Sequence, residues 1–161
     1  MPSGKTLIIG LGNPILGDDG VGWRVAAEVK RLLTSDLISK IEVDTLSLGG
    51  LSLMERLIGY DQAILIDAMD TGREAVGSVS TFKLEELPDP MAGHTASAHD
   101  ATLITAIKAG RSMGASLPDT ILIIAIEARN VYDFSEELSP LVAAAVPEAV
   151  EKVMELLAIF Q

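Results

Sequence analysis

Three side chains of this sequence could together bind a divalent metal ion: Asp19, Asp67 and His99. Asp19 ends a glycine-rich segment that begins at Gly10, Asp67 follows the apolar run Ile64–Ile66, and His99 precedes an apolar helical pattern. Carboxylate oxygens and an imidazole nitrogen are ligands for such ions. The chain has no cysteine, so thiolate ligands, disulfides and a cysteine nucleophile are excluded.

Each of these acids also has a structural interpretation. Aspartate is a favoured helix N-cap, so capping of the following helix would explain either Asp18 or Asp19, but not both. A carboxylate at the end of a buried strand is costly unless it is paired or metal-bound, and Asp67 could instead accept hydrogen bonds from amides of the next loop. For Glu127 and Arg129, which follow another apolar strand, we expect an internal ion pair.

The chain contains two histidines, His94 and His99, in one polar segment. Asp100 immediately precedes an apolar helical pattern and is predicted to be the helix N-cap. His99 would then lie in the loop at the start of that helix, where its position is restrained. This placement favours His99 over His94 as the ligand.

Two other kinds of active site are disfavoured. A dinucleotide-binding turn needs a third glycine where this chain has Ile15, and Asp18 and Asp19 would repel phosphate at the helix start, so no nucleotide cofactor is expected. No Gly-x-Ser-x-Gly sequence presents a serine nucleophile, and Ser97 near His99 lacks such a turn.

Alternating strand and helix patterns must position these side chains. Such alternation predicts one doubly wound α/β domain over residues 1–161, with a mostly parallel sheet and helices on both faces. Strand ends then place the candidate residues in one crevice beyond the carboxyl edge of the sheet. The predicted strands are Thr6–Ile9, Ile41–Leu46, Ala63–Ile66, Gly77–Leu84 (an edge strand) and Thr120–Ile126, and the predicted helices are Val21–Leu33, Leu51–Leu57, Ala101–Met113 and Pro140–Leu157.

Composition limits the partners. The 161 residues carry a net charge of −11, which disfavours nucleic acid, whose phosphates require a basic surface. The composition is 48% hydrophobic but only 4% aromatic, so the core must be aliphatic. No segment approaches the length of about 20 apolar residues that spans a membrane, and the first apolar run is too short for a signal peptide. We therefore expect a cytoplasmic protein without membrane association.

Three motifs, taken in order, resemble the [NiFe]-hydrogenase maturation endopeptidases: Gly10–Gly22 (GLGNPILGDDGVG), Ile66–Ala68 (IDA) and Ser97–His99 (SAH). The resemblance implies that Asp19, Asp67 and His99 bind the metal. It also implies an endopeptidase that removes the C-terminal extension of a hydrogenase large-subunit precursor after nickel insertion. The nickel, presented by this substrate, would serve as the recognition tag, and whether it also polarises the scissile carbonyl or a water stays open.

The sequence departs from this family pattern after the second predicted strand. Many members carry an Asp-Gly-Gly-Thr turn there, associated with substrate recognition, whereas this chain has Asp44–Gly50 (DTLSLGG). The acid comes earlier and the glycines later. Asp44, Gly49 and Gly50 are the corresponding candidates for substrate binding.

Parts of the sequence are also compatible with two other functions. Leu7–Pro14 (LIIGLGNP) also resembles the start of peptidyl-tRNA hydrolases, but the segment that follows lacks their catalytic histidine, and the negative charge opposes tRNA binding. A metal-binding accessory domain, similar to a chaperone, could use the same scaffold without cleaving a peptide. Cleavage of a nickel-loaded precursor distinguishes a peptidase from this alternative.

Overall fold

The computed structural model describes residues 3–47, 49–86 and 98–160, and for residues 98–102 it describes the backbone alone. These residues form a five-stranded sheet in the order β2-β1-β3-β5-β4. The strands are parallel except for β4, which pairs antiparallel with β5 at one edge. The strands are β1 (Thr6–Leu11), β2 (Ile41–Leu46), β3 (Gln62–Met69), β4 (Val79–Lys83) and β5 (Thr120–Glu127).

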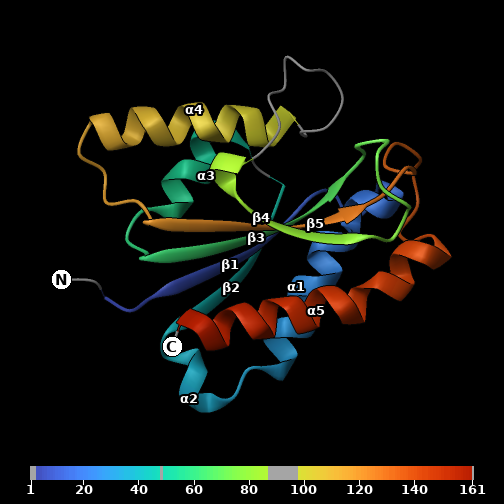
Figure 1. The fold of residues 1–161 in the computed structure, drawn as a ribbon, viewed down its shortest axis with the longest axis horizontal. Helices are drawn as coiled ribbons and strands as arrows, with labels where there is room; N and C mark the ends of the chain where they lie inside the picture. The colour runs from blue at the N-terminus through green and yellow to red at the C-terminus, as the bar shows by residue number, and fades with distance from the viewer. Residues whose placement is uncertain (1–2, 48, 87–97, 161) are drawn as a thin grey trace.

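Helices cover both faces of the sheet, with α3 and α4 on one face and α1 and α5 on the other (Figure 1). The predicted α/β fold with a mostly parallel sheet is therefore confirmed. The helices are α1 (Val21–Leu32), α2 (Ser35–Ile38), α3 (Gly50–Leu57), α4 (Ala98–Ser112) and α5 (Pro140–Phe160), and the 3-10 helices are η1 (Gly17–Gly20) and η2 (Leu84–Glu86).

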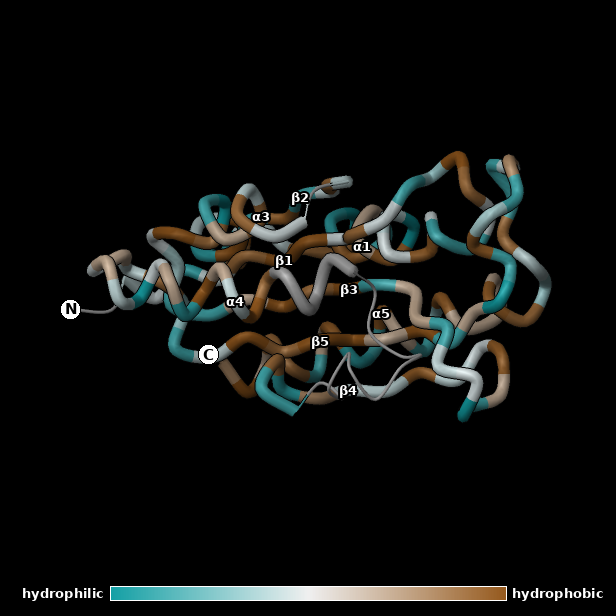
Figure 2. The backbone as a smooth tube through the Cα atoms, turned by 90° about the horizontal axis from the view of Figure 1, so that it is seen from above, coloured by the Kyte–Doolittle hydropathy of each residue, from teal (hydrophilic) through white to brown (hydrophobic). Residues whose placement is uncertain are grey.

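The central strands are hydrophobic along their length because each of their faces is covered, as Figure 2 shows. Successive side chains of a strand point to opposite faces, so they enter two different cores. Ile64 and Ile66 of β3 pack in the core under α1 and α5, whereas Leu65 and Met69 pack in the core under α3 and α4. This alternation determines which face each polar residue of a strand reaches.

Glycine allows α1 to begin directly against the sheet. A Cβ atom on Gly22 would lie 2.3 Å from the carbonyl oxygen of Ile66 and 2.5 Å from that of Leu11. A Cβ atom on Gly10 would lie 2.3 Å from the carbonyl oxygen of Gly22. Close contact between α1, β1 and β3 thus requires both glycines, and it places the β1–α1 loop at the carboxyl edge of the sheet.

The differences from the sequence prediction near the candidate residues include two element boundaries and one additional 3-10 helix. Strand β3 continues to Met69 instead of ending at Ile66, and η1 precedes α1. Helix α4 begins at Ala98, three residues before the predicted start. The predicted loop before α4 lies largely outside the described residues, as does His94. Across the described part of the chain, no helix is both long and apolar enough to span a lipid bilayer.

Candidate active site

The candidate residues belong to segments at the carboxyl edge of the sheet, on the right in Figure 1. The β1–α1 loop supplies Asp19, β3 supplies Asp67, and α4 supplies His99. Helix α4 runs with its N-terminal end toward this edge. In open α/β sheets this is the edge where ligands bind.

Asp19 lies in η1 and stabilises the loop that carries it. Its Oδ2 accepts a hydrogen bond of 2.9 Å from the backbone N–H of Asn13. The loop folds back closely enough that a Cβ atom on Gly12, where φ is +131°, would lie 1.9 Å from the carbonyl oxygen of Asp19. Gly12 is also connected to the β2–α3 loop, because its N–H donates to Leu46 O and its carbonyl oxygen accepts a 2.6 Å hydrogen bond from Ser47 Oγ.

Asp18 is directed elsewhere. Its side chain is buried, and its Oδ1 and Oδ2 accept hydrogen bonds of 2.7 Å from the backbone N–H and the Oγ of Ser139. Ser139 immediately precedes α5, so Asp18 joins the first loop of the sheet to the last helix. The alternative interpretation, in which one of these aspartates caps α1, does not hold, because the N-cap of α1 is Gly20 and no side chain caps it.

Asp67 is buried within β3, two residues before the end of the strand, where it pairs with Ala125 of β5. The prediction that it ends the strand is wrong, because the hydrogen-bonded ladder with β5 continues to Met69 and Glu127. Asp67 alternates with Ile66, so it lies on the same face of the sheet as Leu65 and Met69. This is the face that α4 covers.

His99 is the second residue of α4. The predictions that it lies in a loop and that Asp100 caps the helix are therefore wrong, because both residues already belong to the first turn. The fold brings that turn and Asp67 to the same face of the sheet. Among the described side chains, which do not include that of His99, no group of three acids or histidines is placed to bind a metal ion.

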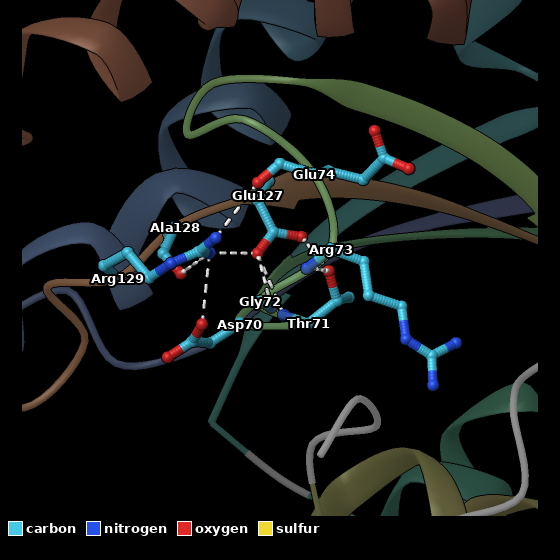
Figure 3. Close-up of polar contacts among 8 residues, drawn as sticks. All are labelled: Asp70, Thr71, Gly72, Arg73, Glu74, Glu127, Ala128 and Arg129. Atoms are coloured by element: carbon cyan, nitrogen blue, oxygen red, sulfur yellow. Dashed lines mark hydrogen bonds and ion pairs between the residues drawn. The ribbon is translucent and has the colours of Figure 1, made fainter.

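Glu127, the last residue of β5, organises the loop that follows β3 (Figure 3). Its carboxylate is buried and accepts hydrogen bonds from the N–H and Oγ1 of Thr71, at 2.9 and 2.5 Å, and from the N–H of Gly72 at 3.3 Å. Because Glu127 also pairs with Met69 in the sheet, it restrains both the end of β3 and the residues that leave it.

Arg129 extends this network. Its Nη1 contacts Glu127 and lies 3.1 Å from Asp70 Oδ1, and its Nη2 donates to the carbonyl oxygen of Glu74 at 3.0 Å. The predicted ion pair between Glu127 and Arg129 is thus confirmed. The sequence does not indicate Thr71 as a donor to Glu127 or the carbonyl oxygen of Glu74 as an acceptor for Arg129, because these partners lie 56 and 55 residues away along the chain.

Asp44 takes part in a separate polar cluster where β2 meets α3. Its Oδ2 lies 3.1 Å from Arg56 Nε, and its Oδ1 accepts a 2.8 Å hydrogen bond from the N–H of Thr45. Arg56 also pairs with Glu42, which in turn accepts a hydrogen bond from the Tyr60 hydroxyl. That hydroxyl is the main cause of the lowered pKa of Glu42, while burial raises the pKa of Tyr60.

The two glycines after β2 lie at the start of α3. Gly49 precedes the helix, and Gly50 is its first residue, with φ at +55°. That conformation is far easier for glycine than for a residue with a side chain. A role for Asp44, Gly49 and Gly50 in substrate binding stays a prediction.

The sequence of this chain is similar to those of hydrogenase maturation proteases. The family model HycI, described as hydrogenase maturation protease, matches residues 24–156. HupD, a hydrogenase expression/formation protein of Rhizobium leguminosarum bv. viciae, is 27% identical over 157 residues, which span 97% of this chain and 75% of HupD. The hydrogenase 2 maturation protease of Escherichia coli K12 is 24% identical over 154 residues, which span 95% of this chain and 90% of that protease.

Solved structures have the same fold. The hydrogenase maturating endopeptidase HybD from Escherichia coli matches with a TM-score of 0.76 and 23% identity, over 96% of this chain and 92% of that one. A [NiFe] hydrogenase maturation protease, HybD from Thermococcus kodakarensis, matches with a TM-score of 0.70 and 26% identity, over 94% of this chain and 98% of that one. With a family model matched over most of its length, this chain belongs to the hydrogenase maturation proteases.

Proposed function

We propose that this endopeptidase removes the C-terminal extension of a [NiFe]-hydrogenase large-subunit precursor after nickel has been inserted, and that it recognises the nickel through Asp19, Asp67 and His99. The observation that carries the proposal is the family match, taken together with a buried carboxylate, Asp67, on the sheet face that the first turn of α4 covers. The nickel belongs to the substrate, so the protease needs no resident metal of its own.

The donor set agrees with this role. Two carboxylates and one imidazole suit a divalent ion of intermediate hardness, and three protein ligands leave coordination positions for groups of the substrate. In the proposal these three side chains act as ligands rather than as acid and base. An ion held in this way can orient the precursor, and it can also polarise a carbonyl or a water. Both uses require the same three residues.

The polar networks around the site would then serve as its support. Asn13 holds the carboxylate of Asp19, and Glu127 holds the loop that follows Asp67. Ligands on elements restrained in this way lose little freedom when they bind. We extend the proposal to Asp44 in β2, Gly49 just before α3 and Gly50 at the start of α3, as part of the surface that faces the precursor.

Processing of purified nickel-loaded precursor, followed by the mass of the product, tests the proposal. Asp19→Asn, Asp67→Asn and His99→Ala should each lower the processing rate more than about 100-fold, because even changes to the outer partners of metal ligands cost 10- to 100-fold. Circular dichroism should show that each variant is folded. His94→Ala is the matched control, and its rate should stay near that of the unmodified protein.

Two results would contradict the proposal. Wild-type processing by Asp19→Asn, Asp67→Asn or His99→Ala would remove that residue from the site. Binding of nickel-loaded precursor by the unmodified protein without any shortening of it would instead favour a metal-binding accessory role for this scaffold.

A further inference from the structure

Three large apolar side chains project into solvent beside the candidate site. Tyr132 is 80% exposed and Phe134 is 85% exposed in the β5–α5 loop, and Ile15 is 47% exposed in the β1–α1 loop. The chain has six aromatic residues, counted as one Trp, two Tyr and three Phe, so two of the six stand exposed within one short stretch of loop. Exposed apolar side chains that gather in this way mark interaction surfaces more often than scattered ones do.

These side chains are carried on two loops that are joined backbone to backbone. Leu16 and Ser135 form a parallel β-bridge. Ser135 N–H donates to Ile15 O at 3.0 Å, and Gly17 N–H donates to Ser135 O at 2.8 Å. The bridge places Ile15 beside Phe134, and a further bond from Asp18 N–H to the carbonyl oxygen of Asn130 secures the start of the second loop. We call Ile15, Tyr132 and Phe134 the hydrophobic rim.

The restraint on these loops matters for binding. Side chains on a preorganised backbone lose less conformational entropy when a partner covers them, and aromatic side chains contribute much of the energy of protein interfaces. Because Ile15 belongs to the same loop as Asp19, a partner that covers the rim is brought to the candidate ligands.

The charge around the rim indicates the chemistry of the partner. Asp133, Glu136 and Glu137 are exposed acids in the same loop, and the whole chain has a net charge of −11. A complementary surface has an apolar recess for the aromatic side chains and basic side chains at its border. Such charge complementarity also speeds association and makes it dependent on salt.

We infer that the hydrophobic rim is the docking surface for the folded body of the hydrogenase precursor. The precursor would receive the rim in an apolar recess that has basic side chains at its border. This inference rests on the proposed function and adds a second contact to it. Asp19, Asp67 and His99 would bind the nickel, and the rim would bind the protein that carries the nickel. A precursor held at both points presents its C-terminal segment to the active site.

Kinetics with purified nickel-loaded precursor test the inference. Phe134→Ser and Tyr132→Ser should each lower kcat/KM about tenfold or more, with the loss carried by a higher KM, because interface aromatics of this kind are frequent hot spots. Ile159→Ser is the matched control. Ile159 is 75% exposed near the C-terminal end of α5, the end that lies away from the β5–α5 loop (Figure 1), and its loss should leave kcat/KM unchanged.

The outcomes separate this inference from the proposed function. If the unmodified protein does not process the precursor, the proposed function fails. If it does, and Phe134→Ser and Tyr132→Ser both process with the wild-type KM, the rim inference alone is overturned. A self-association that Phe134→Ser abolishes without a change in KM, measured by sedimentation, would also overturn it. Precursor binding that weakens as salt increases supports the basic border, and binding insensitive to salt contradicts it.

Discussion

Replacement of Asp18 by alanine should destabilise the protein strongly, although Asp18 is not one of the proposed ligands. The substitution removes both hydrogen bonds to Ser139, each 2.7 Å long, and leaves the backbone N–H of Ser139 without this acceptor. Hydrogen bonds to charged groups contribute about 1.5–3 kcal/mol each, so the loss of two should amount to roughly 3–6 kcal/mol. For a chain of 161 residues, each kcal/mol corresponds to about 2–4 °C in Tm, which predicts a decrease of at least about 6 °C.

Asparagine at the same position should cost less. Its carbonyl oxygen can still accept from the N–H of Ser139, and its amide can donate to the Ser139 hydroxyl, so only the charge is lost. We expect a decrease of about 1–2 kcal/mol for Asp18→Asn. This order, with the wild type most stable and alanine least, follows from the two bonds and not from the size of the side chain.

Urea unfolding monitored by circular dichroism, together with thermal unfolding, provides the measurement. Glu148→Ala serves as the control, because Glu148 is an exposed acid within α5 and its loss should change the free energy of unfolding by no more than about 0.5 kcal/mol. An Asp18→Ala variant as stable as Glu148→Ala would refute the assigned role of Asp18.

Two further changes test the packing and the electrostatics of the fold. Gly22→Ala should lower the free energy of unfolding by about 3 kcal/mol. The added Cβ would clash with the carbonyl oxygens of Ile66 and Leu11, which are backbone atoms and cannot rotate away. A urea midpoint equal to that of the wild type would contradict this prediction. Glu42 has a lowered pKa, mainly through the Tyr60 hydroxyl, so its stabilising contribution is present above its ordinary pKa of 4.5 and is lost as the pH falls through the lowered value. Between pH 7 and pH 3, the free energy of unfolding of Glu42→Gln should therefore fall less than that of the wild type. The difference between the two decreases should be below about 1 kcal/mol, because the Glu42 side chain is 56% exposed. Equal decreases would contradict the assignment.

Sequence periodicity predicted the layers of this fold well, because the central strands are apolar on both faces and differ clearly from the amphipathic helices. It placed the end of β3 too early, since Asp67 interrupts the apolar run while the backbone ladder to β5 continues for two more residues. It also placed the start of α4 too late, because Asp100 has the residue type of an N-cap but already belongs to the helix. Both errors come from inferring a backbone boundary from side-chain polarity.

The surroundings of the candidate site can be predicted only in part, for a related reason. That Asp67 and the start of α4 lie toward the carboxyl edge of the sheet follows from the alternation of strands and helices. The partners that restrain the site do not, since Ser139 lies 121 residues from Asp18 and Thr71 lies 56 residues from Glu127. Neither serine nor threonine has a neighbouring pattern that indicates such a distant acceptor.

The bond between Asp18 and Ser139 also bears on the order in which the protein matures during its own synthesis. The loop that carries Asp19 is synthesised before β2, but one of its restraints, the pair of hydrogen bonds from Ser139 to Asp18, comes from a residue 121 positions later. Contacts of such long sequence separation form late, because the intervening chain must first be closed into a loop. A nascent chain would thus have its sheet partly assembled before the loop is restrained. Docking of α5 would then be the step that completes the loop.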